Sequence, residues 1–134
     1  MNRQDEKQLL RILKESYVLD MYVSQETKHF SPDFHREFQI LVPEFDGSTG
    51  RIADVVWLKP DPTERPDPKA LETDMTFNLS VLDITGKVAV CKVEAFRNVR
   101  LQYTDYVVFT RIDREWKVVA KAFHYHLSSS SDTP

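Results

Sequence analysis

The fold of this chain is decided by its last third, residues 83–126, which read DITGKVAVCKVEAFRNVRLQYTDYVVFTRIDREWKVVAKAFHYH. β-Branched and aromatic residues dominate this stretch, and short polar breaks divide it, which is the pattern of strands joined by tight turns. We predict three strands in a row, preceded by a further strand in residues 74–84 and a turn at Thr85-Gly86. Consecutive strands with such short connections pair as an antiparallel meander.

The register of the last hairpin is open at the level of sequence. Its loop, residues 113–114, contains no glycine that would fix the turn type. A two-residue turn would place Asp105 opposite Ala122. A three-residue loop would instead place Asp105 on the same face as Lys121, with His124 on the other face. Because a slip of one residue exchanges the two faces of a strand, the pattern leaves both arrangements possible.

Polar side chains interrupt these apolar strands at Asp105, Lys121, His124 and His126. Burying such a group costs free energy unless it is hydrogen-bonded or has a function. Asp105 is the strongest candidate for acid–base chemistry, since a positioned carboxylate can move protons. The alternative is a structural carboxylate bonded to Lys121 or to a backbone N–H.

The N-terminal half favours helices before the strands begin. Apolar residues recur at helical spacing and predict an amphipathic helix over residues 4–23. A short second helix is expected at 25–30, because Pro32 prevents its continuation. Residues 34–42 favour a strand, 46–50 a turn, and 52–58 either a strand or a short helix. Helices followed by a run of strands indicate an α+β fold with helices on one face of a sheet.

The length of 134 residues fits one domain, which we place at residues 1–127. Four prolines fall within residues 60–68 and predict an exposed surface loop, because proline cannot donate to a helix or a ladder. The serine-rich segment 128–134 is expected to be a disordered tail.

Composition narrows the classes of partner. A net charge of -3 and a pI near 5.8, without basic clusters, argue against nucleic acid and anionic membranes. The single cysteine, Cys91, excludes an internal disulfide and fits a reducing compartment. No apolar run approaches the ~20 residues of a membrane span, and the polar start lacks a signal core, so we expect a cytoplasmic protein.

Three segments carry a resemblance to a known superfamily: HFSPDF (29–34), DITGKVAVCKVE (83–94) and TDYVVFTRIDREWKVVAKAFH (104–124). They resemble the nuclear transport factor 2-like superfamily, most closely its SnoaL-like and putative lumazine-binding members. The resemblance implies a cone in which about three N-terminal helices pack in the concave face of a strongly curved, mainly antiparallel sheet, with a pocket at the open end. It also implies a homodimer through the outer sheet face, where we expect residues such as Val108, Val119 and Phe123, or their alternates if the register differs.

Candidate site residues follow from the fold that the resemblance implies. For catalysis the candidates are Asp105, Tyr103 and His124. For ligand binding, the residues expected to line the cone are Tyr17, Met21, Phe30, Phe34, Trp57, Tyr106 and Lys121. No metal is expected, because His124 and His126 share a face while His29 and His35 lie in the other half of the chain without further ligands. No phosphate-binding glycine loop or nucleophile elbow is present, and we expect no cofactor.

Three functions remain in competition. The first is a cone domain that binds a small apolar or mixed-polarity molecule without chemistry. The second is a cofactor-independent isomerase, dehydratase or cyclase that uses a pocket Asp with Tyr or His. The third is a dimeric interaction module without chemistry. A paired acid and base within reach of the cone centre would favour the enzyme.

Overall fold

The computed structural model describes residues 2–23, 31–45, 52–58 and 75–126. Several sequence-based predictions lie outside these residues: the second helix at 25–30, the turn at 46–50, the proline-rich loop at 60–68 and the tail at 128–134. No helix within the described ranges is long and apolar enough to cross a membrane.

The N-terminal helical segment begins at α1 (Arg3–Ile12). Asn2 is its N-cap, and its side-chain oxygen accepts hydrogen bonds from the backbone N–H groups of Gln4 and Asp5 at 2.8 and 3.1 Å. This satisfies two of the amide groups that a helix start leaves without partners. The segment is amphipathic as predicted, and its buried face comprises Leu9, Ile12, Leu13, Tyr17 and Val18.

The segment continues through two π-helical stretches, η1 (Leu13–Tyr17) and η2 (Leu19–Val23). The N–H of Val18 donates to the carbonyl of Leu13, five residues back, which is the π-helical pattern. The resemblance led us to expect about three helices, and this count is too high for the described residues, which contain one continuous helical segment. Proline and glycine, which end helices, do not occur between residues 3 and 23.

Six strands form one sheet in the order β2-β1-β6-β5-β4-β3. Their bounds are β1 (Phe34–Phe45), β2 (Ile52–Leu58), β3 (Met75–Thr85), β4 (Val88–Arg97), β5 (Arg100–Ile112) and β6 (Glu115–Tyr125). Neighbouring strands are antiparallel except for β1 and β6, which are parallel. The α+β class and the mainly antiparallel sheet are therefore confirmed, and residues 52–58 form a strand.

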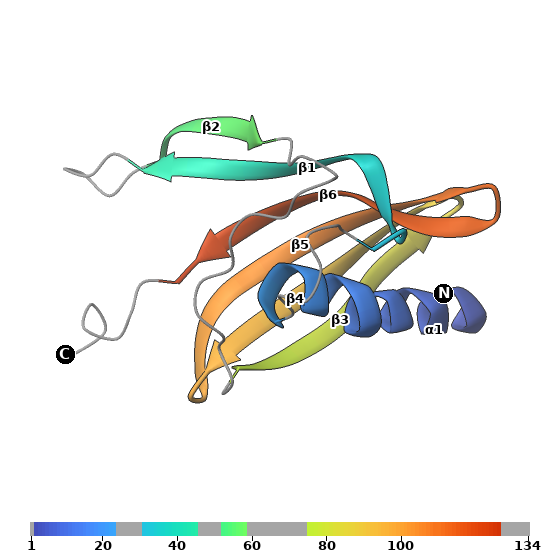
Figure 1. Ribbon diagram of the computed structural model, residues 1–134, viewed down its shortest axis with the longest axis horizontal. Helices are drawn as coiled ribbons and strands as arrows, with labels where there is room; N and C mark the ends of the chain where they lie inside the picture. The colour runs from blue at the N-terminus through green and yellow to red at the C-terminus, as the bar shows by residue number, and fades with distance from the viewer. Residues whose placement is uncertain (1, 24–30, 46–51, 59–74, 127–134) are drawn as a thin grey trace.

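The helical segment lies across the inner, concave face of β3–β6, as Figure 1 shows. Alternate residues of β4 and β5 point toward it and are buried, among them Cys91, Val93, Val107 and Phe109. Breaks in register between Val81 and Asp83 and between Ala95 and Phe96 bend the strands, since bulges increase local twist. Curvature of this kind allows one sheet to enclose a helix.

A hydrogen-bonded cluster fixes the C-terminal half of the helical segment to the start of β1. The hydroxyl of Ser16 donates to the Asp33 carboxylate at 2.5 Å, and the N–H of Ser31 donates to Asp20 at 2.6 Å. At the other end of the segment, Asp5 accepts from the Trp116 indole N–H at 3.2 Å and pairs with Arg111 at 3.3 Å. The segment is thus tied to the sheet at both ends.

The last hairpin combines features of both registers that the sequence left open. Its turn has two residues, because Ile112 pairs with Glu115, and both Asp113 and Arg114 have positive φ. A bulge at Val119 then shifts the register by one, so that Asp105 lies opposite Phe123 instead of Ala122. The bulge therefore places Asp105 and Lys121 on one face and His124 on the other. From the sequence alone, we expected this arrangement only with a three-residue loop.

The outer face of the sheet carries only part of the apolar set that we expected there. Val108 lies on it, half-buried, opposite Val90 and Ala120. Val119 is the extra residue of the bulge. The expectation for Phe123 is wrong, because the shifted register turns its ring to the inner face, where it packs against the core.

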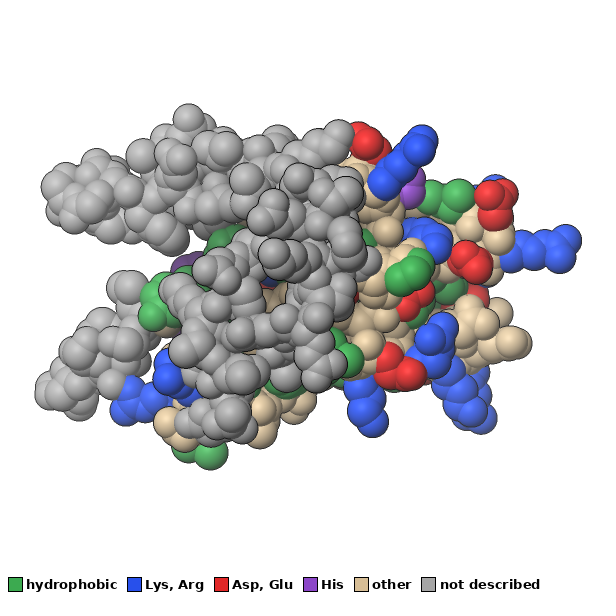
Figure 2. Space-filling model, in the orientation of Figure 1, with side chains coloured by type: hydrophobic (Ala, Val, Ile, Leu, Met, Phe, Trp, Pro, Cys, Tyr) green, Lys and Arg blue, Asp and Glu red, His purple; other side chains and the backbone are tan. Residues whose placement is uncertain are grey.

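Charged side chains of both signs are interspersed on the part of the surface that Figure 2 shows for the described residues. This distribution agrees with the small net charge of -3. Mixed surfaces of this kind do not generate the one-signed field that steers polyanions.

The turn between β4 and β5 stores backbone strain that a substitution can relieve. Asn98 and Val99 have φ values of 50° and 59°, and Val99 is 93 % exposed. A β-branched residue is strained in this region, by about 1–2 kcal/mol, whereas glycine is not. We expect Val99→Gly to raise the free energy of unfolding by about 1 kcal/mol in urea denaturation, since little apolar burial is lost.

The matched control is Gly86→Ala in the neighbouring hairpin. Gly86 has a φ of 58°, and a methyl group on its Cα would meet only open space, so the backbone conformation alone opposes the change. The substitution should lower the free energy of unfolding by about 1 kcal/mol. A Val99→Gly protein no more stable than the parent would contradict the strain assignment.

Candidate functional site

Asp105 is the centre of a buried polar cluster on the inner face of the sheet. Its side chain is 0 % exposed, and it lies on β5 between Val93 of β4 and Phe123 of β6. Its Oδ2 accepts hydrogen bonds from the hydroxyls of Tyr17 and Tyr22, each at 2.7 Å. Hydrogen bonds to a charged acceptor are stronger than neutral ones, so this cluster joins the helical segment firmly to the sheet.

The π-helical stretches explain how both tyrosines reach one oxygen. In a regular α-helix, residues five apart are rotated by about 140° and point in different directions. In a π-helical turn the hydrogen bond joins residues five apart, so Tyr17 and Tyr22 come onto the same side. Such turns in helices frequently occur at functional sites.

Lys121 completes the cluster from β6. Its Nζ lies 3.8 Å from Asp105 Oδ2, and its side chain is only 10 % exposed. The ammonium is also 5.3–5.7 Å from the ring centres of Tyr17, Tyr22 and Phe123. At these distances the ring faces attract a cation, which offsets part of the cost of its burial.

Burial shifts the ionisation of the groups around Asp105. It raises the pKa of Tyr17 and of Tyr22 above the ordinary 10.0, and the neighbouring Asp105 charge raises both further. The tyrosines are therefore neutral hydrogen-bond donors. Burial lowers the pKa of Lys121, and the Asp105 carboxylate opposes this shift.

The second oxygen of Asp105 is the unusual feature of the cluster. Oδ1 is buried and has no hydrogen-bond partner among the residues that the structure describes. Leaving a buried acceptor without a partner costs about 1–3 kcal/mol, more for a charged group, and such atoms are rare in folded proteins. The described residues supply no donor to Oδ1, so this oxygen can accept a hydrogen bond from another molecule.

Aromatic rings surround this cluster on the inner face. Tyr22 contacts Phe77 and Tyr103, with ring centres 5.3 and 5.8 Å apart. Tyr103 in turn contacts Phe123 and Tyr125, at 6.1 and 5.1 Å. The surroundings therefore combine one charged pair with flat apolar walls.

The structure assembles part of the predicted site. Tyr17, Tyr103, Asp105 and Lys121 meet on the inner face. Phe34 lies behind Tyr17, with stacked rings 6.1 Å apart, and Met21 packs against the core. The sequence did not predict Tyr22 as a site residue. It follows Tyr17 by five residues, so a regular α-helix would turn it away from the apolar stripe. Only the π-helical turns place it on the same side as Tyr17.

Two of the predicted site residues lie on the outer face of the sheet. His124 is exposed on the outer face, opposite Thr104, so it does not meet Asp105. Tyr106 is 44 % exposed on that same outer face. Trp57 belongs to β2, where its backbone pairs with that of Leu41, and Phe30 lies outside the described residues.

The two C-terminal histidines form a separate outer-face pair. Their rings meet edge to face at 4.7 Å, and His126 Nε2 is 2.8 Å from the Thr104 hydroxyl. Burial and the neighbouring His124 lower the pKa of His126, while Glu94 opposes the shift. No group of three or more metal-ligating side chains is present within the described ranges.

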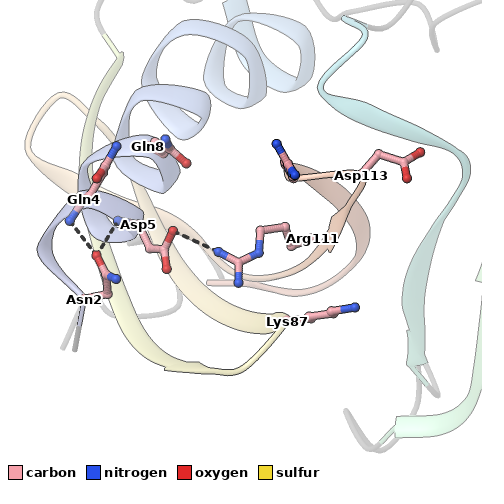
Figure 3. Close-up of a pocket in the computed structure, with 8 residues that line it drawn as sticks. Asn2, Gln4, Asp5, Gln8, Lys87, Arg111 and Asp113 are labelled. Atoms are coloured by element: carbon pink, nitrogen blue, oxygen red, sulfur yellow. Dashed lines mark hydrogen bonds and ion pairs between the residues drawn. The ribbon is translucent and has the colours of Figure 1, made fainter.

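A polar groove of about 630 Å³ lies at the opposite end of the helical segment, as Figure 3 shows. It is lined by Asn2, Gln4, Asp5, Gln8, Lys87, Arg111, Asp113 and Arg114. Asp5 lies about 18 Å along the helix from Tyr17, at 1.5 Å per residue. The groove is therefore distinct from the Asp105 cluster, and its central charges, Asp5 and Arg111, already pair with each other.

The comparison with protein families identifies the chain. Residues 5–124 match the family described as "putative lumazine-binding". The chain belongs to this family. The match covers most of the sequence and includes every residue of the Asp105 cluster. No curated protein matches the sequence.

Solved structures of the nuclear transport factor 2-like superfamily are similar to this member of the family. One from Shewanella baltica, of unknown function, has a TM-score of 0.61 at 17% identity, covering 96% of this chain and 98% of its own. One from Methylobacillus flagellatus, also of unknown function, has a TM-score of 0.64 at 19% identity, with 95% and 96% covered. One from Silicibacter pomeroyi, again of unknown function, reaches 0.61 at 18%, with 94% and 100% covered. At such identities the likeness confirms the superfamily fold that was predicted from the sequence. The function has to be inferred from the site itself.

The tyrosine hydrogen bonds predict a specific response to alkaline pH. Because the pKa of Tyr22 is raised on folding, the folded protein keeps a proton that the unfolded chain loses, and the free energy of unfolding falls as pH rises above about 10. We expect Tyr22→Phe to cost about 1.5–3 kcal/mol at neutral pH, the range for a bond to a charged group, and to flatten the alkaline fall. Urea denaturation across the alkaline range measures both effects.

Tyr106→Phe is the matched control, because this tyrosine lies on the outer face, away from Asp105. It keeps the ring and removes a hydroxyl that does not bond Asp105, so the neutral-pH stability should stay within about 0.5 kcal/mol of the parent protein. Equal behaviour of the two variants would show that Tyr22 does not bond a buried carboxylate in solution.

Proposed function

We propose that this protein binds a small molecule between its helical segment and the curved sheet, with Asp105 as the polar anchor. The single observation that supports this most is the buried Oδ1, which lacks a hydrogen-bond partner among the described residues. A ligand donor at this atom would remove the cost of leaving it unsatisfied. Membership of a family named for ligand binding supports the same conclusion.

The chemistry of the cluster defines the ligand class. Asp105 and Lys121 carry opposite charges, so a neutral ligand keeps the site balanced. Oδ1 requires an N–H or O–H donor. The rings of Tyr22, Phe77 and Tyr103 favour a flat, largely apolar body. The ligand is therefore a small neutral molecule with at least one donor, of mixed polarity. Lumazine, named in the description of the family, has ring N–H groups and a flat ring, and it belongs in any screen.

A cofactor-independent proton-transfer enzyme is the second candidate. The arrangement that favours it is a buried carboxylate bonded by two tyrosine hydroxyls, which offers a proton acceptor beside two neutral donors. In this version Asp105 accepts a proton from the substrate, and Tyr103, whose ring contacts that of Tyr22, donates a hydrogen bond to a substrate oxygen. The His124 contribution suggested by the sequence does not enter, since that imidazole is on the outer face. Substrate turnover that is lost in Asp105→Asn separates this candidate from simple binding.

Asp105→Asn tests the anchor. The amide preserves the shape of the side chain but replaces one oxygen with a donor, so it cannot accept a hydrogen bond at both positions. A ligand present at ~100 times its Kd stabilises a protein by about 2.7 kcal/mol. We expect a thermal-shift screen of neutral heteroaromatic metabolites to yield a stabilising compound, and Asp105→Asn to abolish that stabilisation while the protein stays folded.

The matched control is Asp83→Asn, at an exposed carboxylate that accepts only from the nearby Thr85 hydroxyl in the described structure. It should retain full stabilisation by the compound. If Asp105→Asn instead lowers stability by about 1–3 kcal/mol and leaves binding intact, Asp105 is structural and an internal water is the natural partner of Oδ1.

We also propose that the protein is a homodimer through its outer sheet face. Val90, Val108 and Ala120 lie side by side there, next to the exposed ring of Tyr106. A partner that covers this face would bury an apolar surface that monomers rarely leave open.

Light scattering at micromolar concentration should give twice the monomer mass, and Val108→Glu should halve it. A monomeric parent protein would overturn the proposal, and Lys87→Gln, at a hairpin tip, is the control with the same change in net charge.

A further inference from the structure

Lys121 is poorly explained as a structural ion-pair partner. Its Nζ is 3.8 Å from Asp105 Oδ2, which is beyond hydrogen-bond distance, and within the described residues Nζ makes no hydrogen bond. Oδ2 is already satisfied by two tyrosine hydroxyls at 2.7 Å. The two groups are therefore close enough to attract each other but share no hydrogen bond, although Asp105 is buried and Lys121 is nearly so.

The surroundings of Lys121 favour the neutral amine more than those of a surface lysine do. The side chain is 10 % exposed, and rings of three aromatic residues lie 5.3–5.7 Å from Nζ. Burial penalises the ammonium form and lowers the pKa of Lys121, with Asp105 as the opposing influence. The titratable groups that face it in the described structure are Asp105 from β5 and Tyr17 and Tyr22 from the helical segment. Both tyrosines keep their protons.

We propose that Lys121 is a nucleophilic amine that forms an imine with a small aldehyde or ketone entering the inner-face site. The proposal rests on the proposed function in one respect, that a small molecule can reach this site. It adds a covalent step to that binding. Lysines desolvated in apolar surroundings are the kind that form Schiff bases with carbonyl compounds.

The step balances without an oxidant or a reductant. The Lys121 ammonium gives a proton to the Asp105 carboxylate, and the nitrogen lone pair forms a bond to the carbonyl carbon. The carbonyl oxygen takes up the proton held by Asp105 and a second proton from the nitrogen and leaves as water, and a carbon–nitrogen double bond replaces the carbon–oxygen one. One carbonyl compound and one amine thus give one imine and one water. The protonated imine has Asp105 as its counter-ion, at the position where the ammonium was.

The test uses pentane-2,4-dione, a neutral 1,3-diketone whose imine rearranges to a stable enaminone without added reductant. The protein is incubated with it near neutral pH, and the modified lysines are located by peptide mass mapping over time. Lys14, exposed on the helical segment, is the internal reference. We expect Lys121 to be modified about tenfold faster than Lys14, because more of it is neutral at that pH.

Two variants complete the experiment. Lys121→Met should abolish the fast modification, whereas Lys117→Met, at a lysine that donates to the Pro32 carbonyl outside the cluster, should leave it unchanged. A Lys121 modified no faster than Lys14 overturns the proposal, and this comparison needs only the parent protein. If Asp105→Asn abolishes stabilisation by a ligand but Lys121 does not react with the diketone, the proposed binding function stands and the imine proposal is wrong. If Lys121 reacts quickly while Asp105→Asn leaves stabilisation by ligands unchanged, the imine proposal stands and the role of Asp105 as the ligand anchor is wrong.

Discussion

The hydrogen bonds from Tyr17 and Tyr22 to Asp105 are the interaction on which the rest of this structure depends. A carboxylate that is 0 % exposed would be too costly to keep in an apolar sheet without partners. Two hydroxyls at 2.7 Å supply them, and they come from the helical segment that the sheet encloses. The same bonds that satisfy the charge therefore also hold the helical layer against the sheet, so the stability of the fold and the chemistry of its interior are coupled.

Two irregularities of the backbone make this interaction possible. The π-helical turns align side chains five residues apart, which a regular α-helix would separate. The bulge at Val119 changes the register of β6 so that Lys121 and Phe123 face inward beside Asp105. Without the bulge, the two-residue turn would leave Lys121 on the outer face. Irregular backbone at both places serves one cluster, which is the pattern expected where a fold is adapted to a site.

The hydrogen bonding of the cluster is incomplete, and our functional proposal rests on this feature. Oδ2 of Asp105 has its donors, while Oδ1 has no hydrogen-bond partner among the described residues, and the Lys121 ammonium pairs with Oδ2 only at 3.8 Å. Polar groups that serve structure alone are normally paired, because each one left over lowers stability. The relatives share this fold and their own functions are unknown, so we infer binding from these atoms and not from likeness.

The sequence by itself determined the α+β class, the meander of the last strands, the amphipathic helix and the position of a carboxylate, Asp105, within an apolar strand. These depend on periodicity, propensity and the cost of a buried charge, which are local properties. It also led to the superfamily, through segments that resemble its members. Only the tertiary structure decided that Tyr22 joins Asp105, that His124 does not, and that residues 52–58 form a strand paired with β1. These outcomes depend on a π-helical turn, on one bulged residue and on a neighbouring strand. In each case the competing local conformations are close in energy, and packing between distant segments selects one of them.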